Sequence, residues 1–146
     1  MKDSFENKNT TFVFPDLEKE RGEIGRVARV FAPEDINAFV ERFYERSKKA
    51  TLMVLSEDTW SQLENTDSYD IALGAWKEVE YHAIEGKPEA PRDWKVMRDK
   101  IEQHQLLEAP IVVKMGDRYH LVSGNTRLMV VRALGITPEV LVVDWD

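Results

Sequence analysis

The sequence predicts a single α+β domain, because short stretches of alternating hydrophobicity and longer stretches of helical periodicity follow one another along the chain. The alternating stretches are typical of strands, and the helical stretches are typical of amphipathic helices that pack against a sheet. A chain of 146 residues is long enough for one domain with a sizeable core and short for two. We expect residues 1–10 to form a flexible tail and residues 11–146 to form the domain.

The first third of this domain is predicted to contain two short strands and a helix. Residues Thr11–Phe14 and Gly25–Phe31 alternate apolar and polar side chains, which indicates strands. The stretch from Pro33 to Ala50 indicates a helix, with Pro33, Glu34 and Asp35 suited to its first turn. Its predicted buried stripe has the i, i+3, i+4, i+7, i+8 spacing and consists of Ile36, Phe39, Val40, Phe43 and Tyr44.

Three further helices are predicted in the middle of the chain. One begins after Ser56, which suits the N-cap, and carries Trp60 and Leu63 inward. The next runs from about Asp70 until Gly86 and Pro88 end it. The last covers residues 91–107, with apolar side chains repeated along one face.

The final third is predicted to form a hairpin, a helix and a last strand. Two apolar runs flank the sequence Met115-Gly116-Asp117-Arg118, which indicates a hairpin with a glycine-containing turn. Helical spacing begins after Gly124 and ends at Gly135, which suits the position after a helix. Residues 138–146 then form a final buried strand.

Composition excludes several classes of function. The chain has no cysteine, so disulfides, thiolate catalysis and zinc–thiolate sites are ruled out. It has no apolar run long enough to cross a bilayer and no secretory signal at its polar N-terminus, so we expect a cytoplasmic protein without membrane contact. A net charge of −7 makes nucleic acid an unfavourable partner.

The turn Ser123-Gly124-Asn125-Thr126-Arg127 is the strongest candidate for a binding site. Glycine permits positive φ and close approach of a ligand, and the N–H groups at the start of the following helix are unpaired and attract anions. Arginine in a first helical turn opposes the helix dipole, which is reasonable where an anion lies beside it. The alternative is structural: a serine or asparagine cap, a glycine turn and a solvated arginine.

The stretch from Ile101 to Gly135, "IEQHQLLEAPIVVKMGDRYHLVSGNTRLMVVRALG", resembles the core of the ParB/sulfiredoxin-like superfamily. The resemblance covers about residues 92–143 and lies in the order of helix, hairpin, Gly-x-x-Arg turn and Ala/Leu-rich helix. It implies a small mixed sheet with packed helices. It also implies ATP or CTP binding, with the phosphates at Gly124 and Arg127 and with Asn125 and Thr126 in the variable middle. Small stand-alone members, some of them phage-encoded, are the most similar kind.

Departures from the family pattern limit what the resemblance implies. Asn125 stands where sulfiredoxins have their reactive cysteine, so reductase activity is excluded. No helix-turn-helix follows the core, so DNA clamping or nuclease activity is disfavoured. The family's upstream Pro-x-x-x-Arg box has only loose counterparts, among them Arg92.

Catalysis would require more than a phosphate site. Members of this kind are often proposed to be nucleotide-dependent kinases, and Mg²⁺-dependent phosphoryl transfer, by a kinase or an NTPase, requires carboxylates. Asp67 and Asp70 have i, i+3 spacing and are the candidates, although Asp70 would equally serve as a helix N-cap. His120 precedes the turn on the strand face opposite Leu121, where it is either exposed or directed at the site. The alternative function is a non-catalytic protein-interaction module with a degenerate nucleotide pocket.

Overall fold

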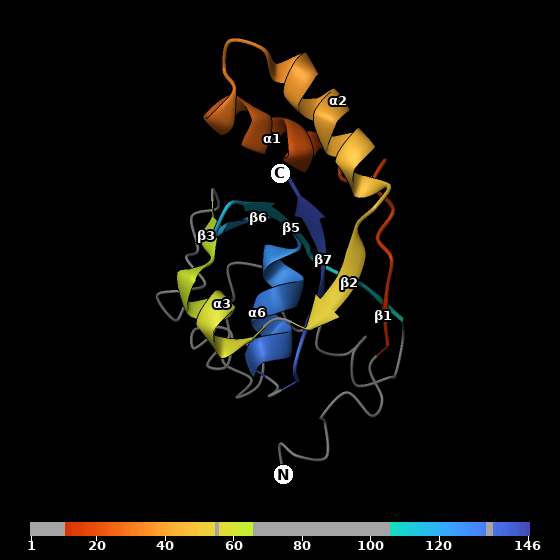
Figure 1. The fold of residues 1–146 in the computed structure, drawn as a ribbon. Coiled ribbons are helices and arrows are strands. Elements are labelled where there is room, and N and C mark those ends of the chain that lie inside the picture. Colours follow the sequence, from red (N-terminus) through yellow and green to blue (C-terminus); the bar gives the residue numbers. More distant parts are fainter. Residues whose placement is uncertain (1–10, 55, 66–105, 134–135) are drawn as a thin grey trace, which may run out of the picture.

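The computed structural model describes residues 11–54, 56–65, 106–133 and 136–146, and it has mixed α and β structure (Figure 1). A five-stranded mixed sheet lies between two layers of helices, with α1 and α2 on one side and α6 on the other. The described elements, in chain order, are β1 (Phe12–Val13), α1 (Arg21–Phe31), α2 (Ile36–Ser47), β2 (Thr51–Val54), α3 (Glu57–Gln62), β3 (Glu64–Asn65), β4 (Leu107–Glu108), β5 (Ile111–Met115), β6 (Arg118–Ser123), α6 (Asn125–Ala133) and β7 (Glu139–Asp144).

The sheet has the strand order β2-β7-β5-β6-β3. β5 and β6 form the predicted antiparallel hairpin, in which Gly116 has a φ of 63°. β7 runs parallel to β5 on one side and antiparallel to β2 on the other, so the predicted last strand lies inside the sheet. β1 and β4 form a separate parallel pair, in which Phe12 aligns with Leu107.

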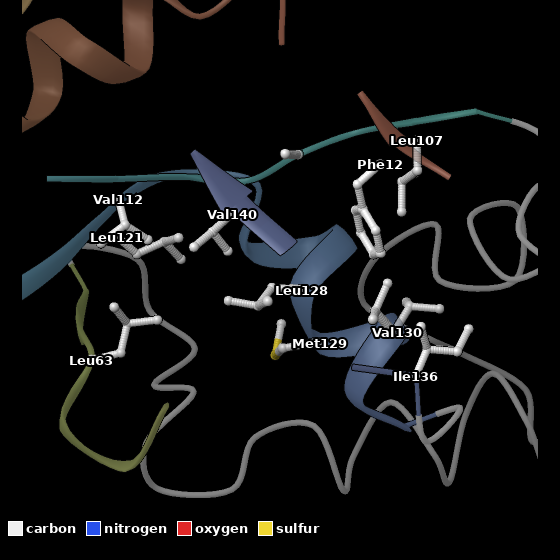
Figure 2. Close-up of a cluster of buried hydrophobic side chains, with 12 residues drawn as sticks. Phe12, Leu63, Leu107, Val112, Leu121, Leu128, Met129, Val130, Ile136 and Val140 are labelled. Carbon is white, nitrogen blue, oxygen red and sulfur yellow. The ribbon is translucent and has the colours of Figure 1, made fainter. Parts of the chain in front are cut away.

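Strand alternation divides the core into two layers. On one face, Ile111, Val113 and Val122 pack against α1 and α2, where Phe43 is fully buried. On the other face, Val112 and Leu121 pack against α6. Figure 2 shows side chains of α6 opposite those of the sheet, with Leu63 at one end of the layer and the β1 and β4 residues Phe12 and Leu107 at the other.

The strand predicted at Gly25–Phe31 is wrong, because these residues belong to helix α1. Ile24, Val27 and Ala28 are buried at the i, i+3, i+4 spacing of a helix and face α2 and the sheet. The apparent alternation of the segment arises because an arginine precedes each of its two valines. Tertiary packing along one helical stripe therefore prevails over the local strand pattern.

The helix predicted from Pro33 is confirmed as α2, but it begins later, at Ile36. Asp35 is its N-cap: the side chain accepts a hydrogen bond from the Ala38 N–H at 3.1 Å. The predicted buried stripe is also confirmed, because Phe39 and Phe43 are buried in the core cluster that α1 and α2 form with the sheet.

The middle of the chain is described only in part. Ser56 caps α3 as predicted, with its hydroxyl accepting from the Thr59 N–H at 3.2 Å. The helix predicted from Asp70, and most of the one predicted over residues 91–107, lie outside the described residues. At the end of the latter, Leu107 is not helical but belongs to β4, because its backbone pairs with β1. β1 itself confirms the strand predicted at Thr11–Phe14, whereas β2 was not predicted.

Candidate functional site

The strand–glycine–helix turn is present as predicted. β6 ends at Ser123, Gly124 has a φ of 95°, and α6 begins at Asn125. A Cβ atom on Gly124 would lie 2.8 Å from Pro110 Cα and 2.9 Å from the Nη2 atom of Arg127. Both the backbone conformation and the close approach of these neighbours therefore require glycine.

The Arg127 side chain folds back over this glycine and is largely buried, with 18% of its surface exposed. Its Nε and Nη2 atoms are buried and have no hydrogen-bond partner within the described part of the chain. These two nitrogens donate along the same edge of the planar guanidinium, and together they can bind two oxygens of one carboxylate or phosphate. A buried pair of charged donors without hydrogen bonds is costly, so this arrangement favours an anion beside it.

The carboxylate of Glu20 lies beside Ser123 and Arg127. Its Oε2 atom accepts a hydrogen bond from the Ser123 hydroxyl at 2.5 Å, and its Oε1 atom lies 3.7 Å from Arg127 Nη2. Glu20 is the N-cap residue of α1, but its side chain makes no capping hydrogen bond to its own helix. It extends instead to the start of α6.

A second carboxylate, that of Glu108, flanks the same cluster. It accepts hydrogen bonds from Lys19 Nζ at 2.7 Å and from the Asp16 N–H at 2.6 Å. These bonds, of which the one from Lys19 matters most, lower the pKa of Glu108, and the positive charge of Arg127 lowers it further. The turn before α1 is thus held to β4 by Glu108 and to α6 by Glu20.

His120 is buried, with 6% of its surface exposed, and lies away from this cluster. Its ring is nearly perpendicular to that of Phe31, with the two ring centroids 4.9 Å apart, and its Nδ1 atom is 3.4 Å from Glu64 Oε1. Phe31 and Glu20 are at opposite ends of α1, which is about 16 Å long at the usual rise per residue. Of the two predicted alternatives, exposure is thus wrong, and the contacts of His120 are with Phe31 and Glu64 rather than with the turn.

The pKa of His120 reflects its burial. Loss of solvation lowers the pKa below the usual 6.5, and the nearby Glu64 carboxylate opposes this effect. The Glu64 carboxylate accepts two hydrogen bonds from Arg118, one from Nε at 2.9 Å and one from Nη2 at 2.8 Å. These bonds lower the pKa of Glu64. His120 is accordingly a neutral, packed residue at neutral pH.

The remaining predicted site residues are placed only in part. Asn125 and Thr126 form the first turn of α6, where the backbone N–H groups precede the first helical hydrogen bond, from the Leu128 N–H to the Gly124 carbonyl. Asp67, Asp70 and Arg92 lie outside the described residues. Among the residues that are described, no group of three or more metal-binding side chains is present, and no helix is long and apolar enough to cross a membrane.

Sequence reasoning missed Glu20 and Glu108. Both carboxylates reach the site through tertiary contacts, and neither belongs to a motif near the turn. Glu20 stands in the charged stretch "PDLEKERGE", whose acids and bases have no periodic pattern that singles one out. No local signal could have identified either of them.

Comparison with known proteins found no matching family model, no similar curated protein and no similar solved structure. The resemblance to the ParB/sulfiredoxin-like superfamily therefore stays a prediction. The geometry of Ser123, Gly124 and Arg127, with Glu20 beside them, defines a candidate anion site.

Proposed function

We propose that this chain binds a nucleotide, ATP or CTP, through phosphate groups held at Ser123–Arg127. The observation that carries the proposal is the buried Nε and Nη2 pair of Arg127, which has no hydrogen-bond partner among the described residues. A terminal phosphate supplies the paired oxygens and the negative charge that such a guanidinium binds best. The proposed membership of the ParB/sulfiredoxin-like superfamily supports a nucleotide as the source of that phosphate.

Each residue of the turn has a part in this binding. Gly124 lets the ligand and the Arg127 side chain approach the backbone, because it has no Cβ. The N–H groups of the first turn of α6 donate to the phosphate oxygens and add the positive end of the helix dipole. The Ser123 hydroxyl, which now donates to a carboxylate, can donate to a phosphate oxygen instead.

The proposal extends to Mg²⁺-dependent phosphoryl transfer, as a kinase or an NTPase. A phosphate site alone positions the nucleotide, and transfer also requires carboxylates that hold the metal ion. Asp67 and Asp70 are the proposed ligands, as the sequence predicts.

The direct test is calorimetric titration of the protein with ATP and with CTP, with and without Mg²⁺. Arg127→Ala should weaken binding about tenfold or more, because it removes a charge-assisted pair of hydrogen bonds. Arg29→Ala is the matched control: it removes the same charge from an exposed position on α1 and should leave the affinity unchanged. Absence of binding at millimolar nucleotide, or equal affinity of the wild type and Arg127→Ala, would refute the proposal.

A second candidate function is recognition of a protein partner, which an exposed sheet edge favours. Among the strands that the structure describes, β2 is an outer strand of the sheet, and Met53 and Val54 on it are 51% and 63% exposed. An extended peptide could pair with this edge as an added strand. A photo-crosslinker at Val54 should then capture one specific protein that the same group at Val30 of α1, which is 56% exposed, does not capture. Identical products from both positions would argue against it.

A further inference from the structure

We infer that the Glu20 carboxylate is an internal occupant of the anion site, and that a phosphate ligand binds by replacing it. This inference rests on the proposed function and adds a regulation of the same site. Glu20 contacts the two side chains that are proposed to hold the phosphate: its Oε2 atom takes the hydrogen bond of Ser123, and its Oε1 atom faces Arg127 Nη2.

The fit of Glu20 is incomplete at Arg127. A separation of 3.7 Å is an ion pair but too long for a hydrogen bond, so the Nε and Nη2 donors are not satisfied by the residues that the structure describes. A phosphate has more negative charge and more acceptor oxygens than a carboxylate, and it can satisfy Ser123 and both Arg127 donors together. The carboxylate is thus a weaker occupant of a site that suits a larger anion.

Access to the donors requires a side chain to move. The two Arg127 nitrogens are closed from solvent, and the Glu20 carboxylate lies 3.7 Å from one of them, Nη2. The Glu20 side chain is attached at the start of α1, so it can swing outward without disrupting a capping hydrogen bond of that helix. We therefore expect a phosphate to reach Arg127 by replacing this carboxylate.

The turn itself stays anchored when Glu20 leaves. Glu108 holds Lys19 and the Asp16 backbone through separate hydrogen bonds, and these do not involve Glu20. Displacement therefore releases one side chain and the contact between α1 and α6, rather than the whole segment before α1. Binding of a phosphate is expected to change the environment of the first turn of α1.

The test compares three proteins by titration with ATP and with CTP: wild type, Glu20→Gln and Glu23→Gln. Glu20→Gln keeps the shape of the side chain but removes the competing charge, so its affinity should rise about tenfold. Glu23→Gln removes the same charge from the first turn of α1, away from the site, and should match the wild type. If the wild type binds and Glu20→Gln binds no more tightly, this inference alone is overturned. If neither binds, the nucleotide proposal is overturned with it.

A second measurement uses the unaltered protein. Amide signals of Arg21–Glu23 should shift in the same NMR titration, and with the same apparent affinity, as those of Gly124–Arg127. Shifts at Gly124–Arg127 without any at the start of α1 would show that the ligand binds without displacing Glu20, which overturns the inference.

Discussion

The Ser123 hydroxyl donates a hydrogen bond to the Glu20 carboxylate, although the two residues are 103 positions apart in the chain. This bond joins the end of β6 to the start of α1. Because Ser123 is buried and Glu20 is nearly so, the contact fixes how α1 meets the start of α6. Gly124, which follows Ser123, has no room for a larger side chain.

Substitution of Gly124 tests this lack of room. We expect Gly124→Ala to lower the free energy of unfolding by about 1–3 kcal/mol, because the new methyl group would meet Pro110 and Arg127 at a φ that disfavours side chains. Gly116→Ala is the control: it also has a positive φ, but a Cβ added there would have no heavy atom within 4 Å, so it should lose only about 1 kcal/mol. Urea denaturation of both variants measures the difference, and equal losses would contradict the close contact.

Gly25 tests the helical structure of α1. It lies inside the helix with nothing within 4 Å of an added Cβ, so Gly25→Ala should raise the free energy of unfolding by about 0.5–1 kcal/mol. The gain arises because alanine restricts the unfolded chain and favours the helix. Thermal or urea denaturation measures it. A loss of stability in Gly25→Ala would contradict the open space around Gly25 on this helix.

His120 makes stability depend on pH. Its pKa is lowered in the folded state by burial, so the unfolded chain binds the proton more readily. The stabilisation from neutral His120 is complete above the unfolded pKa near 6.5 and is lost as the pH falls toward the lowered folded value. Between about pH 7 and about pH 5, His120→Gln should therefore lose less stability than the wild type. Parallel pH profiles of the two proteins would contradict this role.

Glu64 moderates that effect. Its carboxylate raises the pKa of His120 against the effect of burial, so Glu64→Gln should move the His120 pKa further down. An NMR titration of the imidazole C–H signals measures the change directly. Glu45→Gln, which removes an exposed carboxylate paired with Lys48 on α2, should leave the His120 pKa where it is. An unchanged His120 pKa in Glu64→Gln would show that the Glu64 contact is not made in solution.

Local pattern predicted much of the fold. The spacing of apolar residues predicts α2, the strands β5 and β6, and α6, and the serine and glycine positions predict the cap of α3 and the turn at Gly124. These elements succeed because their signals lie within a few residues and agree with the tertiary packing. The strand prediction for Gly25–Phe31 fails because an arginine precedes each of the two valines and so imitates strand alternation, although Ile24, Val27 and Ala28 share a helical face.

The rest depends on contacts between distant parts of the chain. Leu107 leaves the predicted helix because Phe12 supplies a strand partner, and β2 forms because β7 aligns beside it. The candidate site likewise contains residues that the local sequence predicts and a residue that only tertiary contacts bring in. Ser123, Gly124 and Arg127 follow from a local motif, whereas Glu20 reaches them only through the packing of α1 on the sheet.

The position of β7 in the sheet has a consequence for how the protein is made. β7 lies between β2 and β5, so residues 51–54 and 111–115 share no edge until residues 139–144 arrive between them. During synthesis, the early helices and the β5–β6 hairpin can form as the chain emerges, but the sheet stays open until this late segment inserts. The sheet is therefore completed only after residues 139–144 have been made, and nascent chains that stall before Glu139 expose two unpaired, apolar strand edges to chaperones and to aggregation.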